Sequence, residues 1–404
     1  MISGSTILVM AGQGVVAPIL PLYAREFGVN TAMVGLTLSV FGFARLVLNV
    51  PFGMLSDRHG RRLLLVGGPL VTAVGMLGSG LAGGIWVLLA WRTVAGAGSA
   101  AYMTGAQLYL IDISTPANRA RFIGTNQGAL LAGVSIGPGI GGLVAQWFGF
   151  RAPFYVVGVS ALVAGAYAWW RLPETNHEVV SGSRTSPQQP RTRAAFRFAL
   201  SADFVAVAAV TMAIFTIRVG GRGTMAPLLG TERFGMSPGA LGGIFTATAV
   251  TGLFLIAPAA FLTDRLGRKA TIVPGGLIAG AGLVLMAAAP STFWFAAGIV
   301  LAAIGTGISG PAPAAYAGDI APAELRGLAM GMYRSAGDVG FVLGPPILGA
   351  IADATNIDTA LWANALLIVV ASLWFGVRAR ETSGRKAAFQ PPADAAVEAE
   401  DVPP

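Results

Sequence analysis

The stretch Gly53-Met54-Leu55-Ser56-Asp57-Arg58-His59-Gly60-Arg61-Arg62 is the strongest indication of the fold, because its second part recurs later in the chain as Asp264-Arg265-Leu266-Gly267-Arg268-Lys269. The two copies are 207 residues apart. The same offset joins four more pairs: Asp112 and Asp319, Arg119 and Arg326, Gly137-Pro138 and Gly344-Pro345, and Phe27-Gly28 and Phe234-Gly235. One constant offset over five landmarks predicts an internal duplication with two similar halves.

The composition indicates a membrane protein. Hydrophobic residues make up 54% of the 404 residues and charged residues only 11%, against roughly 25% charged in ordinary globular proteins. A membrane helix needs about 20 mostly apolar residues. Twelve such stretches are predicted, at 5–22, 31–52, 63–81, 85–110, 122–146, 152–171, 202–230, 238–262, 270–289, 292–316, 327–352 and 358–379.

The basic residues predict the orientation. With a cytoplasmic N-terminus, 18 of the 26 Lys and Arg residues fall in inner loops, three (Arg25, Arg151 and Arg233) in outer loops and five inside spans. This bias predicts a multi-pass protein of the plasma membrane with both termini in the cytoplasm. The net charge of +8 is therefore spread along one membrane face and does not indicate a nucleic-acid partner. The first span starts close to Met1 without a basic region or cleavage site, so no removed signal peptide is expected.

The predicted fold is an all-α membrane protein with twelve helices in two parallel six-helix repeats around a central cavity. The domains are residues 1–172, a cytoplasmic linker at 173–200, residues 201–380 and a disordered tail at 381–404. Two parallel bundles favour alternating access by rocking about the cavity. Because the cavity lies within one chain, a monomer is expected in the lipid bilayer.

Three motifs in this arrangement resemble the major facilitator superfamily. The stretch from Gly53 to Arg62 is similar to its loop motif, and Arg92-Thr93-Val94-Ala95-Gly96-Ala97-Gly98 to its span 4 motif. The glycine-rich stretch Gly133 to Gly142, with Gly137-Pro138 and Gly141-Gly142, resembles the span 5 antiporter signature. The stretch Ala17-Pro18-Ile19-Leu20-Pro21-Leu22-Tyr23 at the end of span 1 and this glycine-rich stretch both resemble the twelve-span drug:proton antiporter branch. The resemblance implies that Arg92 takes part in proton coupling. It also implies that the glycine–proline motifs form a seal between the halves.

A gating role is expected at the cytoplasmic helix ends. A carboxylate there can face the positive N-terminus of a neighbouring helix or pair with Arg. The expected partners are the start of span 11 for Asp57 and of span 5 for Asp264; a solvated turn is the alternative. The predicted gating set is Asp57, Arg58, Arg61, Arg62, Asp112, Arg119, Asp264, Arg265, Arg268, Asp319 and Arg326.

Charges inside spans are the candidate functional groups, because each costs roughly 2.5–3.5 kcal/mol on insertion scales. Asp338 is the one mid-span acid, and Arg334 lies one turn before it on the same helix face. Either the two form a structural ion pair, or Asp338 binds a proton and Arg334 tunes it. Arg92 either takes part in the coupling or donates to carbonyls of a neighbouring helix.

Arg218 and Arg222 share a face of span 7, and they either contact an anionic substrate group or extend along the cavity wall. Arg45 is a candidate residue of the substrate cavity, and a structural role is the alternative interpretation. Pro138 and Pro345 each remove an intrahelical hydrogen bond and are expected to bend their helices. The predicted substrate cavity comprises Gln13, Arg45, Tyr102, Phe215, Arg218, Arg222 and Phe245; the predicted helix-bend set comprises Gly133, Gly137, Pro138, Gly141, Gly142, Gly344 and Pro345.

No enzyme chemistry is indicated. The chain has no Cys, and its two His residues lie in polar stretches, so no metal site is expected. Nucleotide-binding and nucleophile-elbow patterns fall inside apolar helices, without the strand that they require. The sequence therefore predicts a secondary transporter of a small molecule without a cofactor, driven by an ion or substrate gradient. Proton-coupled export of small amphipathic compounds is favoured; a proton symporter or uniporter importing an organic anion is the alternative.

Overall fold

The computed structural model describes Thr6, Val9 and residues 12–115, 118–175, 198–322 and 325–382. All regular elements in these ranges are helices. The N-terminal half contains α2 (Leu20–Arg25), α3 (Thr31–His59), α4 (Arg61–Gly80), α5 (Ile85–Asp112), α6 (Arg119–Phe148) and α7 (Ala152–Arg171). The C-terminal half contains α10 (Ala202–Thr216), η1 (Ile217–Met225), α11 (Ala226–Phe234), α12 (Pro238–Leu266), α13 (Lys269–Ala287), α14 (Thr292–Ser309), α15 (Ala312–Ile320), α16 (Arg326–Ala354) and α17 (Ile357–Arg378).

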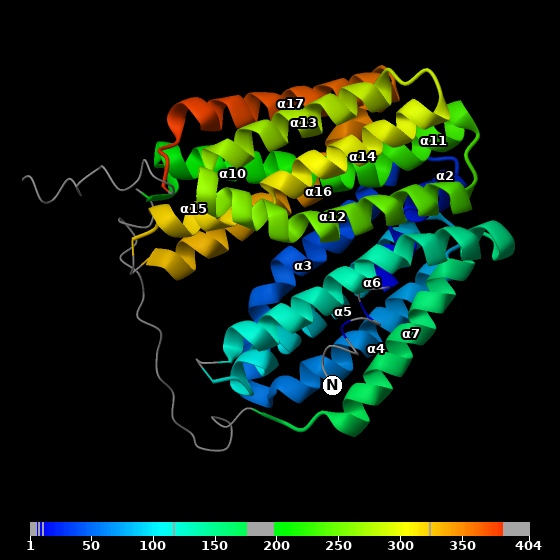
Figure 1. Ribbon diagram of the computed structural model, residues 1–404. Helices are drawn as coiled ribbons and strands as arrows, with labels where there is room; N and C mark the ends of the chain where they lie inside the picture. Colours follow the sequence, from blue (N-terminus) through cyan, green and yellow to red (C-terminus); the bar gives the residue numbers. More distant parts are fainter. Residues whose placement is uncertain are drawn as a thin grey trace, which may run out of the picture.

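Ten helical segments of the described chain are long and apolar enough to cross a membrane. The 28-residue α5 supplies the fourth predicted span, and it packs between α3 and α4. Of the first predicted span, the structure describes Thr6, Val9 and residues 12–22, which include the start of α2. This arrangement confirms the predicted all-α fold of two six-helix halves, which Figure 1 shows as the blue-to-green and green-to-red bundles.

The loop motifs fold alike because each contains one glycine that makes the turn. Gly60 joins α3 to α4 with φ of 94°, and Gly267 joins α12 to α13 with φ of 100°. Residues with a side chain strongly disfavour such positive φ angles, whereas glycine adopts them readily. The helices on either side of each glycine therefore reverse direction within a residue or two.

Two helix pairs hold the halves together. The helix α3 packs on α16, and α6 packs on α12. A Cβ added at Gly142 or Gly242 would overlap the backbone of the opposite helix, and one added at Gly35 would overlap Pro345. Small residues therefore let the backbones approach, as in other membrane helix pairs.

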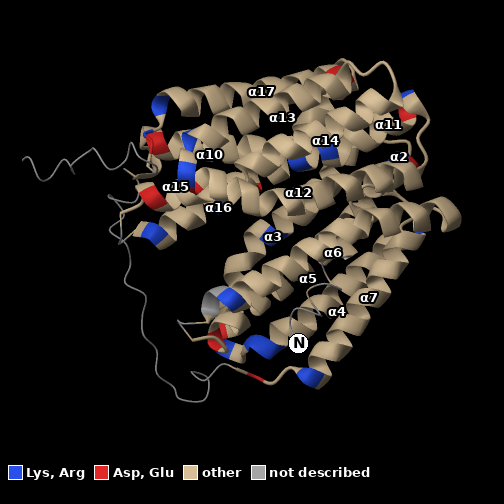
Figure 2. Cartoon of the chain, viewed as in Figure 1, with Lys and Arg blue, Asp and Glu red and all other residues tan. Residues whose placement is uncertain are grey.

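The two ends of the molecule differ. We call the end with the two loop motifs the motif end, and the end with α2 and α11 the far end. Figure 1 shows the two halves together at the far end and apart at the motif end. Charged residues gather at both ends, with mainly uncharged helix between them (Figure 2). This distribution matches a protein whose middle lies in hydrocarbon.

The contact between α6 and α12 predicts the effect of Gly142→Leu. The added side chain meets the α12 backbone, so the free energy of unfolding should fall by about 1–3 kcal/mol. Thermal unfolding of the detergent-solubilised protein measures this. The control is Gly124→Leu on the same helix, where a Cβ meets nothing within 4 Å. Equal melting temperatures for the two variants would contradict the packing described.

Candidate functional site

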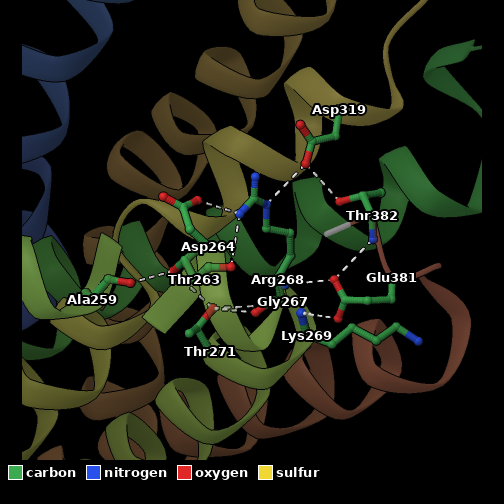
Figure 3. Close-up of polar contacts among 10 residues, drawn as sticks. All are labelled: Ala259, Thr263, Asp264, Gly267, Arg268, Lys269, Thr271, Asp319, Glu381 and Thr382. Atoms are coloured by element: carbon green, nitrogen blue, oxygen red, sulfur yellow. Dashed lines mark hydrogen bonds and ion pairs between the residues drawn. The ribbon is translucent and has the colours of Figure 1, made fainter. Parts of the chain in front are cut away.

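At the motif end of the C-terminal half, Arg268 links two acidic residues (Figure 3). Its Nη1 donates to Asp264 Oδ1 at 2.9 Å, and its Nε donates to Asp319 Oδ2 at 3.1 Å. The Glu381 carboxylate accepts hydrogen bonds from the backbone N–H of Arg268 at 2.8 Å and of Lys269 at 3.1 Å. An anion at the start of α13 also interacts favourably with the helix dipole. The network thereby ties α12, α13 and α15 to the residues that follow α17.

The N-terminal half repeats this network. Arg61 donates to Asp57 at 2.6 Å and to Asp112 at 3.0 Å. The Glu174 carboxylate accepts hydrogen bonds from the backbone N–H of Arg61 at 2.8 Å and of Arg62 at 3.0 Å. Each member lies 207 residues before its counterpart. The duplication read from the sequence therefore extends to individual hydrogen bonds.

Glu174 and Glu381 are network members that the sequence did not predict, and they fall in the predicted linker and tail. Thr175 and Thr382 belong to the same networks, since their hydroxyls donate to Asp112 and Asp319 at 3.3 and 2.9 Å. The signal was present, because both Glu-Thr pairs obey the 207-residue offset. Of the predicted linker and tail, residues 176–197 and 383–404 lie outside the described residues.

The remaining predicted gating residues lie around these networks. The ion pairs of Asp57 and Asp264 are within their own halves, and the two side chains are 67% and 75% exposed. Arg265 stacks on Phe261, while Arg58 and Arg326 are exposed at the motif end. The Arg119 side chain lies outside the described part of the structure. Contacts of the aspartates with spans 5 and 11 of the opposite half remain a prediction.

At the far end, polar contacts join the two halves. The Asp353 carboxylate, on α16, accepts from the backbone N–H of Thr31 at 2.7 Å and of Ala32 at 2.8 Å, at the start of α3. The corresponding residue of the other half is Gln146, whose side chain accepts from the Gly239 N–H at 3.2 Å, at the start of α12. Arg25 and Glu232 add an ion pair at 3.0 Å between the halves. These contacts join the two halves at the far end.

The centre of the molecule contains a cavity of about 330 Å³ between the halves. Its charged lining residues are Arg92, Arg218 and Arg222, and its polar lining includes Gln13 and Thr248. Gln13 donates to Ser99 at 2.8 Å. The predicted cavity residue Phe245 also lines it. We call this space the central cavity.

Arg92 is buried beside α3. Its guanidinium lies 4.7 Å from the centre of the Phe41 ring, and its Nε is 3.5 Å from the Thr37 carbonyl oxygen. The carbonyl contact is the structural alternative considered from the sequence, and it is present. The same side chain also lines the central cavity, so the structure accommodates both interpretations of Arg92.

Arg218 and Arg222 lie on the π-helix η1, which the sequence did not predict. Short π-helical segments inside α-helices are frequent at functional sites. The Thr224 hydroxyl donates to the Val219 carbonyl five residues earlier, at 2.9 Å. The glycines at 220, 221 and 223 are the local signal that could have revealed an irregular helix here.

A second space, of about 490 Å³, lies between the central cavity and the motif end; we call it the vestibule. Helices of both halves line it, and among its lining residues are Arg45, Phe215, Arg334 and Asp338. Asp338 is the sole carboxylate of this lining, and in the described structure it has no ion pair within 4.0 Å. The structure therefore does not contain the Arg334–Asp338 ion pair considered from the sequence.

The other predicted residues have packing positions. Tyr102 is fully buried and lies 2.9 Å from the Thr6 hydroxyl, and it lines neither space. Pro138 lines the central cavity, while Gly141 packs against the backbone of Val15. Gly344 packs against Thr216, and Pro345 against Gly35. Gly133 and Gly137 are buried in α6.

The model of the family described as Major Facilitator Superfamily matches residues 2–220 and again residues 211–399. This chain belongs to the major facilitator superfamily. An uncharacterised transporter of the superfamily from Methanocaldococcus jannaschii is 25% identical over 91% of this chain and 95% of its own length. Multidrug resistance protein 2 of Bacillus subtilis is 23% identical over 89% of both chains.

The fold also matches a solved structure. A bacterial homologue of the human lysosomal transporter Spinster, in an inward-facing and unoccupied conformation, superimposes with a TM-score of 0.79. Its sequence identity is 17%, and the match covers 93% of this chain and 95% of that one. This major facilitator protein is therefore an integral membrane transporter of the plasma membrane and not an enzyme.

The duplicated networks predict that Glu381→Gln weakens the start of α13. Gln offers one acceptor oxygen in place of a carboxylate, so one charge-assisted bond to the Arg268 or Lys269 N–H is lost. Amide exchange in this turn should speed up by about tenfold, which corresponds to about 1.4 kcal/mol. Hydrogen–deuterium exchange with mass spectrometry measures it. Glu26→Gln, at the exposed far end, is the control, and unchanged exchange in Glu381→Gln would count against the network.

Proposed function

We propose that this protein exports small amphipathic compounds from the cytoplasm in exchange for protons. The observation that carries the proposal is Asp338, the one carboxylate of the described vestibule lining, which also includes Arg45 and Arg334. Protonation removes the charge whose burial is costly when an inward-open vestibule closes. The similarity to Multidrug resistance protein 2 of Bacillus subtilis supports export, and the span 5 glycine–proline motif agrees with it.

In the proposed cycle, the motif end faces the cytoplasm and the protein works as a monomer. The vestibule admits substrate while the Asp353 and Gln146 contacts keep the far end shut. Rocking the two halves then closes the motif end and opens the far end. During that step, the Asp57 and Asp264 side chains are proposed to become less exposed and to contact the opposite half.

Import of an organic anion remains the second candidate, since one observation favours it. The charged residues that line the central cavity are all arginines. Substrate charge and transport direction are separate properties, so cationic lining does not by itself exclude export. Vesicles of known orientation distinguish the two directions.

Proton coupling is tested with Asp338→Asn in everted membrane vesicles. In the wild type, a transported compound added from a panel of cationic, neutral and anionic molecules should dissipate a preformed proton gradient, reported by a pH-sensitive dye. The variant should lose at least about 90% of this response, because an amide binds no proton in this pH range. Glu26→Gln should behave like the wild type. A variant that retains the full response would exclude Asp338 from coupling.

The far-end latch is tested with Asp353→Asn. Loss of the carboxylate at the start of α3 should cost about 1 kcal/mol and raise the open fraction of the far end about fivefold. The chain has no Cys, so a single Leu20→Cys in the central cavity reports opening through its labelling by an impermeant maleimide added to right-side-out vesicles.

The matched control for the latch is Asp358→Asn. Asp358 also lies at the far end, but its partner Arg233 belongs to the same half. It should therefore leave the labelling rate of Leu20→Cys unchanged. If Asp353→Asn labels no faster than this control, the Asp353 contact does not hold the far end shut.

A further inference from the structure

The central cavity has an unbalanced charge. Three guanidinium groups line it, from Arg92, Arg218 and Arg222, and the described lining contains no carboxylate. None of the three forms an ion pair within 4.0 Å among the described residues. Arg92 is buried, Arg222 is half-buried and Arg218 is exposed. Charges of one sign on the wall of a cavity inside a membrane protein are costly, and a bound anion would compensate them.

The three arginines differ in how far their donors are used. Arg92 is turned toward α3, where it meets the Phe41 ring and the Thr37 carbonyl. Arg222 donates from Nη2 to the Thr248 hydroxyl at 3.0 Å, but its buried Nε has no hydrogen-bond partner in the described structure. The Arg218 guanidinium lies 5.6 Å from the centre of the Phe215 ring, and no hydrogen bond from it is formed with the described residues. The free donors therefore belong mainly to Arg218 and Arg222.

The internal duplication shows that the scaffold does not require these two charges. The positions 207 residues before Arg218 and Arg222 are Ala11 and Val15. The loop-motif arginines, in contrast, are present in both halves. Because the equivalent helix of the first half has no charge at these positions, the arginines are an addition specific to the cavity side of η1.

The rest of the cavity wall is mainly apolar, with Gln13 and Thr248 as its polar members. Leu38, Phe41, Met76, Phe245 and Phe341 line it together with the arginines. A ligand that fits this wall has a small apolar body, and its charged group faces η1. Guanidinium groups bind carboxylate and sulfonate oxygens through short, charge-assisted hydrogen bonds.

We propose that the central cavity binds a compact organic acid, with its anionic group at Arg218 and Arg222 and its apolar body against the aromatic wall. The identification of this acid as the transported substrate rests on the proposed transport function. Its binding to the cavity can be tested without any transport assay. The proposal excludes lipophilic cations as preferred ligands of this protein.

The experiment is isothermal titration calorimetry on the purified full chain in detergent, at pH 7 and fixed salt, with no gradient. The probes are 1-naphthoate, 1-naphthamide and 1-naphthylmethylammonium, which share an aromatic body and differ in charge. The wild type should bind naphthoate at least about tenfold more tightly than the other two. Arg218→Gln and Arg222→Gln should each weaken naphthoate binding by about 10- to 100-fold and leave naphthamide binding within about threefold.

The control is Arg378→Gln, an exposed arginine at the end of α17 that lines neither space. It should bind all three probes as the wild type does. Equal affinities of the wild type for the three probes, a preference for the ammonium compound, or unchanged naphthoate binding in both Gln variants would overturn the proposal. The comparison of probes on the wild type decides the matter even where a variant fails to fold.

This test and the test of proton coupling fail separately. Naphthoate binding without proton movement in vesicles would leave the anion site in place and remove the proposed coupling. Proton movement with a neutral or cationic compound, and no preference for naphthoate in calorimetry, would remove the anion site and leave the coupling.

Discussion

The whole architecture depends on one arginine in each half held between two carboxylates at the motif end. Arg61 joins the end of α3 to the end of α5, and Arg268 joins α12 to α15. Glu174 and Glu381 then fix the last helix of each half to the same turn. Because these interactions stay inside each half, they make it a rigid unit, and rigid units are what a rocking mechanism requires.

The contacts between the halves have a different character. At the far end they are a few polar contacts made at helix starts, by Asp353, Gln146 and the Arg25–Glu232 pair. In addition to these polar contacts, glycines let α6 approach α12 and α3 approach α16. Contacts of this kind are individually modest, so breaking them lies within the range of binding energies of small ligands. A rigid interior and a separable interface together are consistent with alternating access.

Duplication built the scaffold, but the chemistry of the centre is not duplicated. Arg92 has Ile299 as its counterpart, Arg45 has Gly252, and Asp338 has Leu131. The charges of the motif-end networks recur at the 207-residue offset, whereas the charges of the cavity and the vestibule occur once. This contrast separates residues that maintain the fold from those available for substrate and proton.

The apolar spans, the duplication and the glycine turns of the loop motifs follow from the amino-acid sequence alone, because hydrophobicity, glycine positions and a constant offset can be read from it directly. It also placed Arg92, Arg218, Arg222 and Asp338 among the interior charges. The contacts that polar and charged side chains make depend on the tertiary structure. Glu174 meets Arg61 and Asp353 meets Thr31, since contacts between residues distant in sequence are set by how helices pack. The π-helix under Arg218 and Arg222 likewise depends on packing that a helical hydrophobic pattern does not encode.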